Sequence, residues 1–124
     1  AARGGLNNKR FPNGDTLTSN YAQFLNDSGA LPVGSLLPNG FGLSDMAGNV
    51  WEWCYDWYSS TEYQSGPVID PSGPAHGDFK IQRGGSWIDM EISNRCAMRS
   101  YDLPDNLGGA YAFASRGFRL AVSR

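Results

Sequence analysis

The run Gly42-Leu43-Ser44-Asp45-Met46-Ala47-Gly48-Asn49-Val50-Trp51-Glu52-Trp53-Cys54 is the most informative stretch of this chain. Two carboxylates, Asp45 and Glu52, flank a short turn that contains a glycine. Such a turn exposes backbone carbonyls, and carboxylate and carbonyl oxygens are the ligands that Ca²⁺ prefers. Trp51 and Trp53 then occupy alternate positions, as in an extended strand whose successive side chains point to opposite faces. The run therefore predicts a turn suited to a hard cation, followed by a strand over residues 51–57.

Working outward from this run, short elements and ordered turns dominate the chain. The 124 residues include 16 glycines and 7 prolines, which is unlike a helical bundle and fits one domain over 1–124. Alternating apolar residues predict strands at 79–83 and 117–123. A helical turn is expected at 21–25 and another within 43–50, while 93–100 fits either a strand or a short turn. The predicted class is α+β, with irregular loops dominating and long ones at 58–77 and 102–115.

The low and slightly negative charge of the chain bears on which classes of molecule it can bind. Charged residues make up 18% of the chain and the formal net charge is −2, without a basic patch. Nucleic acid is therefore not an expected partner, because its recognition depends on clustered cations. No apolar run is long enough to span a membrane, and the chain does not open on a secretory signal. A protein or a small molecule is the expected partner.

The two cysteines leave three alternatives open. Cys54 and Cys96 both lie among apolar and aromatic residues. They fit buried free thiols, a single disulfide in an oxidising compartment, or a reactive or metal-binding pair. The last is the least favoured, because neither has a second cysteine or a histidine nearby in sequence.

Several further motifs occur in a fixed order along the chain. They are Arg3-Gly4-Gly5-Leu6, Phe11-Pro12-x-Gly14, Pro32-Val33-Gly34, Pro38-Asn39-Gly40-Phe41-Gly42-Leu43, Asp45–Trp53, Arg83-Gly84-Gly85-Ser86-Trp87, Arg95-Cys96-Ala97-Met98-Arg99 and Gly117-Phe118-Arg119-Leu120. Together they resemble the sulfatase-modifying-factor family, whose founding member is the formylglycine-generating enzyme. The resemblance covers essentially the whole chain and implies a loop-rich variant of the C-type lectin fold, with short strands and few helices. It also implies that the chain corresponds to the C-terminal half of the family domain, either as a fragment or as a shortened relative. In a shortened relative, the apolar surface that a missing N-terminal half would cover is expected to be covered by a partner chain or exposed.

The resemblance implies a structural calcium site in the opening run. Its ligands would be the side chains of Asp45 and Glu52 and the carbonyls of Gly48 and Val50. The alternative is that both carboxylates are ordinary caps or ion-pair partners. The arginines that match the family, at positions 83, 95, 99 and 119, are expected to bridge carboxylates and loop carbonyls with their planar forks.

One family feature is missing from the chain. The formylglycine-generating enzymes carry a cysteine pair shortly after Gly-Gly-Ser-(Tyr/Trp), which binds Cu(I) and activates O₂. In this chain Ile88-Asp89-Met90-Glu91-Ile92-Ser93-Asn94 follows Trp87, and it contains no thiol. Cys96 corresponds to the family's structural cysteine instead. Carboxylates are hard ligands that do not suit Cu(I), so we expect no copper and no copper-dependent oxidation.

The resemblance leaves two other branches of the family open: members without the cysteine pair that oxidise small molecules or natural-product precursors, and displayed binding proteins. We expect a non-catalytic binding module of the second kind. Variable proteins of diversity-generating retroelements have a Gly-Gly-Ser-Trp … Gly-Phe-Arg-Leu frame that this chain shares, and such displayed proteins favour an extracellular or cell-surface location. The expected ligand face comprises Trp51, Ser86, Trp87, Asp89, Glu91, Asn94, Tyr101, Asp102, Asn106 and Tyr111. The alternatives are an oxidoreductase related to the formylglycine-generating enzyme, acting on a sulfatase cysteine or another substrate, and a domain that serves only as a scaffold.

Overall fold

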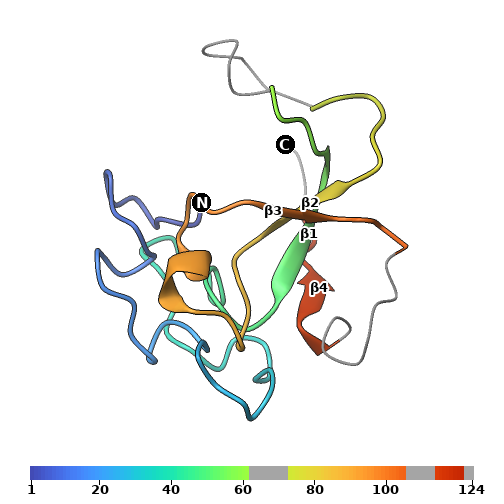
Figure 1. Ribbon diagram of the computed structural model, residues 1–124. Coiled ribbons are helices and arrows are strands. Elements are labelled where there is room, and N and C mark those ends of the chain that lie inside the picture. Colours follow the sequence, from blue (N-terminus) through green and yellow to red (C-terminus); the bar gives the residue numbers. More distant parts are fainter. Residues whose placement is uncertain (62–72, 106–113, 122–124) are drawn as a thin grey trace.

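A four-stranded mixed sheet organises the computed structural model, which describes residues 1–61, 73–105 and 114–121. The strands are β1 (Trp51–Trp57), β2 (Lys80–Arg83), β3 (Ser100–Asp102) and β4 (Arg116–Phe118), in the order β3-β2-β1-β4. β1 pairs antiparallel with β2 and parallel with β4, and β2 pairs antiparallel with β3. The strand expected at 51–57 is confirmed and is the longest, and it has a neighbour on both sides (Figure 1).

Several expected elements differ in length or type. The strand expected at 79–83 covers Lys80–Arg83. At the strand expected at 117–123, β4 covers Arg116–Phe118, residues 119–121 are irregular, and 122–123 lie outside the described residues. Segments 21–25 and 43–50 are turns and bends rather than helical turns. The open alternative for 93–100 is resolved by the 3-10 helix η2 (Glu91–Asn94), a turn, and the start of β3. The α+β, loop-rich class with few helices is confirmed.

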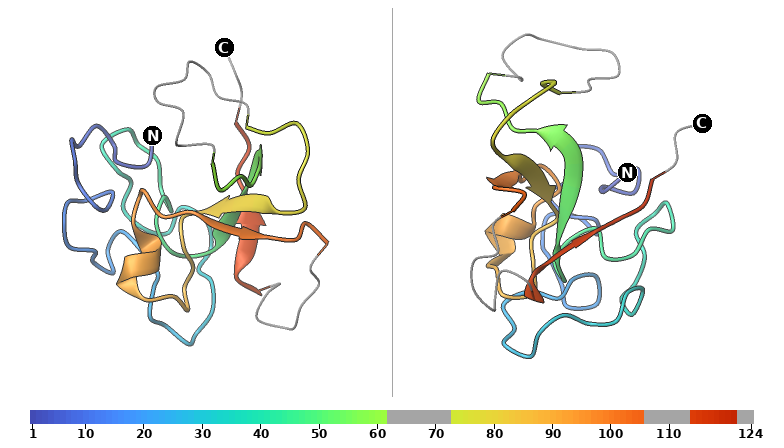
Figure 2. Two further views of the ribbon diagram at one scale, coloured as in Figure 1. Left: turned by 45° about the horizontal axis from the view of Figure 1, so that its top comes forward. Right: turned by 90° about the vertical axis from the view of Figure 1, so that its right-hand side faces the viewer.

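Loops provide most of the packing outside the sheet. The N-terminal loops, blue to teal in the figures, lie together with η2 to one side of the sheet (Figures 1 and 2). The core cluster there contains Phe11, Leu17, Ala22 and Ala47, all at most 5% exposed, with Phe24 packed against it. A core this small leaves many apolar side chains outside it, including Val33 and Phe118 at 89% and 75% exposure.

Candidate functional site

The turn before β1 is held in a conformation that few sequences adopt. Asp45, Gly48 and Asn49 all have left-handed backbones, with φ of 57°, 71° and 65°. A Cβ on Gly48 would lie 2.2 Å from the carbonyl oxygen of Gln23, so only glycine fits there. Asn49 is 3% exposed, and its side chain accepts a hydrogen bond from the N–H of Leu31 at 2.9 Å and donates to the carbonyl of the same residue. These contacts fix the turn that carries the predicted calcium ligands.

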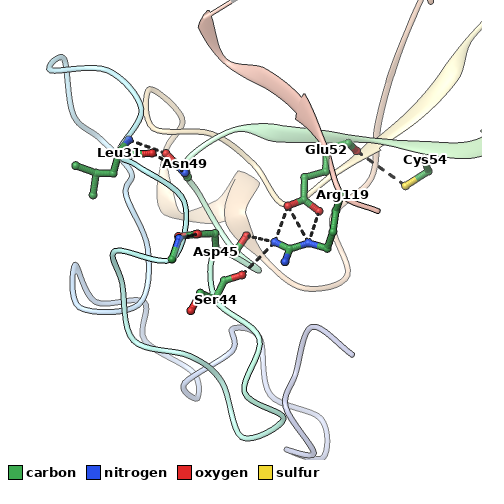
Figure 3. A network of polar contacts seen from close by, with 8 residues as sticks. Leu31, Ser44, Asp45, Asn49, Glu52, Cys54 and Arg119 are labelled. Carbon is green, nitrogen blue, oxygen red and sulfur yellow. Dashed lines mark hydrogen bonds and ion pairs between the residues drawn. The ribbon is translucent and has the colours of Figure 1, made fainter. Parts of the chain in front are cut away.

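Arg119 joins this turn to the segment after β4. Its Nη2 donates to Glu52 Oε1 at 2.7 Å, and its Nε lies 3.1 Å from both carboxylate oxygens (Figure 3). The same Nη2 donates to the carbonyls of Ser44 and Asp45 at 3.0 and 3.3 Å. The hydrogen bond and charge of Glu52 raise the pKa of Arg119, so the guanidinium stays charged. The expected arginine fork between a carboxylate and loop carbonyls is present at this position.

The Asp45 carboxylate is only partly satisfied. Its Oδ2 accepts a hydrogen bond from the N–H of Gly34 at 2.7 Å. Its Oδ1 is buried and has no hydrogen-bond partner. A buried carboxylate oxygen without a donor carries a free-energy cost, and a bound cation would remove that cost. The donor chemistry and this orphaned oxygen fit Ca²⁺, while Glu52 is already engaged by Arg119.

A pocket of about 620 Å³ opens beside these groups, and we call it the Arg119 pocket. The charged groups in its wall are Asp45, Glu52 and Arg119, and apolar residues including Val33 and Phe118 form other parts of it. The predicted ligands Gly48 and Val50 also line it. The structure thus gathers all four predicted calcium ligands around one cavity, although the two carboxylates bind different partners.

The residues from Gly85 to Asn94, which we call the Gly85 frame, are held by an internal network. Asp89 Oδ2 accepts hydrogen bonds from Trp51 Nε1 at 2.8 Å and from the backbone N–H and hydroxyl of Ser86 at 3.0 and 2.5 Å. Leu17 donates its backbone N–H to Glu91 Oε1 at 3.2 Å. These side chains therefore hold separate segments of the chain together.

Several residues of the expected ligand face are buried in this frame. Ser86, Trp87 and Asn94 are 0%, 4% and 0% exposed. Trp87 donates from Nε1 to the Ala114 carbonyl at 3.1 Å, and Asn94 donates to the Met90 carbonyl at 2.8 Å. Ligand contact at these three positions would require the surface above them to open. Trp51, Asp89 and Glu91 are half-buried.

The rest of the expected ligand face lies on and beyond β3. Tyr101 is 48% exposed, and its ring stacks on Tyr58 with centroids 3.9 Å apart. Asp102 is half-buried and forms an ion pair with Arg116 of β4. Asn106 and Tyr111 lie outside the described residues.

Both cysteines are free thiols, which answers the question that the sequence left open. Cys96 is 8% exposed and Cys54 is half-buried. Burial is the main cause that raises the pKa of each thiol, so neither is activated as a thiolate. Among the residues that the structure describes, no three His, Cys, Asp or Glu side chains gather as a metal cluster. No helix in that part of the chain is long and apolar enough to cross a membrane.

Comparison with known protein families accounts for the ordered motifs along the chain. The model of the sulfatase-modifying factor enzyme 1-like domain matches residues 1–124. The chain belongs to this family. The formylglycine-generating enzyme of Streptomyces coelicolor is 41% identical over 131 residues, which cover 91% of this chain and 42% of that protein. This member of the sulfatase-modifying-factor family therefore spans less than half the length of that relative.

Solved structures of similar proteins agree with the assignment. Treponema denticola variable protein 1 is 31% identical, with a TM-score of 0.76, covering 94% of this chain and 41% of that one. PvdO from Pseudomonas aeruginosa is 26% identical, with a TM-score of 0.72, covering 94% and 46%. The formylglycine-generating-enzyme-like scaffold predicted from the motifs is thus confirmed.

Sequence reasoning missed two contributors to this family member's candidate site. Asn49 clamps Leu31, 18 positions earlier in the chain, through both ends of its amide. Arg119 was expected to bridge a carboxylate and loop carbonyls, and an ion pair was the alternative role for Glu52. The pairing of these two residues with each other was not expected. Because 67 residues separate Arg119 from Glu52, no local pattern links them. The charged arginine in the closing Gly-Phe-Arg motif was the one available signal.

Proposed function

We propose that this chain is a non-catalytic module that binds a protein or a small molecule on a formylglycine-generating-enzyme-like scaffold. The observation that carries the proposal is the thiol-free segment at 88–94, directly after the Gly-Gly-Ser-Trp motif. The two cysteines of the chain lie elsewhere, and burial keeps both thiols protonated near neutral pH. Similarity to the Treponema variable protein supports a binding role, and we extend the proposal to variable binding proteins of diversity-generating retroelements.

The ligand would meet the outer surface of the Gly85 frame. Ile88, Met90 and Ile92 are 43%, 68% and 54% exposed and occupy every second position. Exposed apolar side chains within one short segment provide contact area that a partner can bury. Asp89 and Asn94 in the same segment are held by internal hydrogen bonds that do not involve these three side chains, so the three side chains can change without loss of the fold.

The second candidate function is an oxidoreductase of the formylglycine-generating type, which the 41% identity to the Streptomyces enzyme favours. Incubation of the purified chain with Cu(I) and a cysteine peptide bearing the sulfatase motif separates the two. We expect no aldehyde above a no-protein control when the peptide is analysed by mass spectrometry. Aldehyde formation that is lost in a variant lacking Cys54 and Cys96 would overturn the proposal.

A comparison of gene sequences tests the proposal that this chain is a variable binding protein of a diversity-generating retroelement. Copies of the gene from related isolates should differ mainly at exposed positions between 88 and 111, such as Met90 and Ile92. Ser86, Trp87 and Asn94 should stay constant, because they are buried in the frame. Substitutions spread evenly over the chain would reject the link to a diversity-generating retroelement.

We also propose one structural Ca²⁺, held by the side chains of Asp45 and Glu52 and the carbonyls of Gly48 and Val50. The ion would neutralise the two carboxylates and stiffen the turn before β1, without taking part in a reaction. The unpartnered, buried Asp45 Oδ1 supports a cation here. Removal of the ion with EDTA should lower the melting temperature by several degrees, because a ligand that binds only the folded state stabilises it. No shift, together with no ion in the protein by elemental analysis, would reject the calcium site.

A further inference from the structure

Three oxygens converge on one nitrogen of Arg119. Glu52 Oε1 and the carbonyl oxygens of Ser44 and Asp45 lie 2.7, 3.0 and 3.3 Å from Nη2. A carboxylate and two carbonyls gathered around a positive centre are the kind of environment that a hard cation receives from a protein. Figure 3 shows that Arg119 faces Glu52 on β1 from one side and the 44–45 loop from the other.

We infer that Arg119 acts as a built-in cation at this site, and that its guanidinium and Ca²⁺ compete for Glu52. This inference rests on the calcium part of the proposed function and identifies the residue that sets the affinity. Both guanidinium nitrogens that contact Glu52 would have to loosen their hold before the carboxylate could turn fully to a metal ion. The guanidinium also places a positive charge beside the ion, which repels a divalent cation.

The exposure of the pair allows this exchange. The side chains of Arg119 and Glu52 are 37% and 22% exposed, and the Arg119 pocket opens beside them. An arginine released by the metal can therefore turn into solvent without leaving a buried charge. Asp45 Oδ1, which has no donor while the guanidinium holds Glu52, would gain a partner when a metal ion binds.

The test measures metal affinity directly in the purified chain. Tb³⁺ binding is followed by tryptophan-sensitised luminescence, with Trp51 and Trp53 on either side of Glu52, and Ca²⁺ is then used to displace it. Arg119→Gln should bind Ca²⁺ at least about tenfold more tightly than the wild type, because a nearby positive charge has been removed. Arg119→Lys keeps the charge and should stay near the wild type.

Arg95→Gln is the matched control, because Arg95 is half-buried and likewise donates to a loop carbonyl, that of Ile92 at 3.0 Å. It should leave the affinity unchanged. The far-ultraviolet circular dichroism spectrum of each variant checks that it folds. Arg119→Met, which also removes the charge but keeps a long side chain, takes the place of Arg119→Gln if that variant does not fold.

The possible outcomes distinguish failure of the inference about Arg119 from failure of the proposed calcium site. Tighter Ca²⁺ binding by Arg119→Gln, and not by the other variants, supports the inference. It supports the inference even if the wild type binds no metal, although that absence of binding would reject the structural Ca²⁺ of the proposed function. Wild-type binding that Arg119→Gln leaves equal or weakens overturns the inference while the calcium site stands. Absence of binding in both proteins overturns both.

Discussion

The Gly85 frame and the Arg119 pocket each hold one buried oxygen without a hydrogen-bond partner, the amide oxygen of Asn94 and a carboxylate oxygen of Asp45, and they differ in how their aspartates are bound. In the frame, a single carboxylate oxygen of Asp89 accepts three hydrogen bonds from Trp51 and Ser86. In the pocket wall, Asp45 accepts one hydrogen bond and keeps a buried oxygen without a partner. The aspartate of the first region joins segments of the chain, whereas the aspartate of the second has an unpartnered carboxylate oxygen beside a cavity, where a cation could bind. Strong family motifs occur in both, so motif strength alone does not distinguish structural from ligand-binding residues.

The largest expected effect comes from adding one methyl group to each region. Gly85 and Gly34 have similar left-handed backbones, with φ of 77° and 75°. A Cβ on Gly85 would lie 2.3 Å from Asn94 Oδ1, while a Cβ on Gly34 meets nothing within 4 Å. Gly85→Ala should cost about 3 kcal/mol or more of unfolding free energy, and Gly34→Ala about 1 kcal/mol from backbone strain alone.

Urea denaturation of both alanine variants measures this difference. The two glycines have nearly the same φ, so the difference between the two losses of stability reports mainly the packing of the frame. Equal losses of stability would mean that the frame can shift to accept a side chain, and that it is no more closely packed than the pocket.

A second, smaller contrast compares the two aspartates. Asp89→Ala leaves three donors without their acceptor, including Trp51 Nε1, and should cost about 2–4 kcal/mol. Asp45→Ala removes one hydrogen bond, to the exposed Gly34 N–H, together with an unpaired buried oxygen. Its expected cost is about 1 kcal/mol or less in metal-free buffer.

The midpoint of urea denaturation for each aspartate variant, measured in EDTA and again in Ca²⁺, checks this prediction. Ca²⁺ should raise the stability of the wild type and of Asp89→Ala but not of Asp45→Ala. A calcium response that survives in Asp45→Ala would remove Asp45 from the ligand set.

The features that could be predicted from the sequence are those that depend on residues close together in the chain. The alternation of Trp51 and Trp53 was sufficient for β1, and ordered motifs were sufficient for the family. Burial of Ser86 and Trp87 could not be read from their motif, because a glycine-rich turn serves equally well to expose or to enclose the residues after it. The link between Arg119 and Glu52 depends on β4 pairing parallel with β1, a contact between distant segments that no period or spacing reveals.

The smallest expected effect concerns the two thiols, one near each region. Cys96 follows the frame and is 8% exposed, whereas Cys54 on β1 is half-buried. Burial raises the pKa of both thiols above the ordinary value of 9.0, so the folded state holds these protons more tightly than the unfolded state. This contribution to stability is complete below the unfolded pKa and is lost as the pH rises through the folded pKa. Stability should therefore fall slightly in the alkaline range, and Cys54→Ser and Cys96→Ser should each reduce that fall.

Thiol labelling compares the same two positions at neutral pH. Each single serine variant keeps one thiol, which is labelled with iodoacetamide at about pH 7.5. Both thiols should react more slowly than free cysteine, and Cys96 should react the more slowly of the two because it is the more buried. Labelling of Cys96 at the rate of free cysteine would indicate that the segment after the frame opens readily in solution, and the contrast between a closed frame and an open pocket would then be lost.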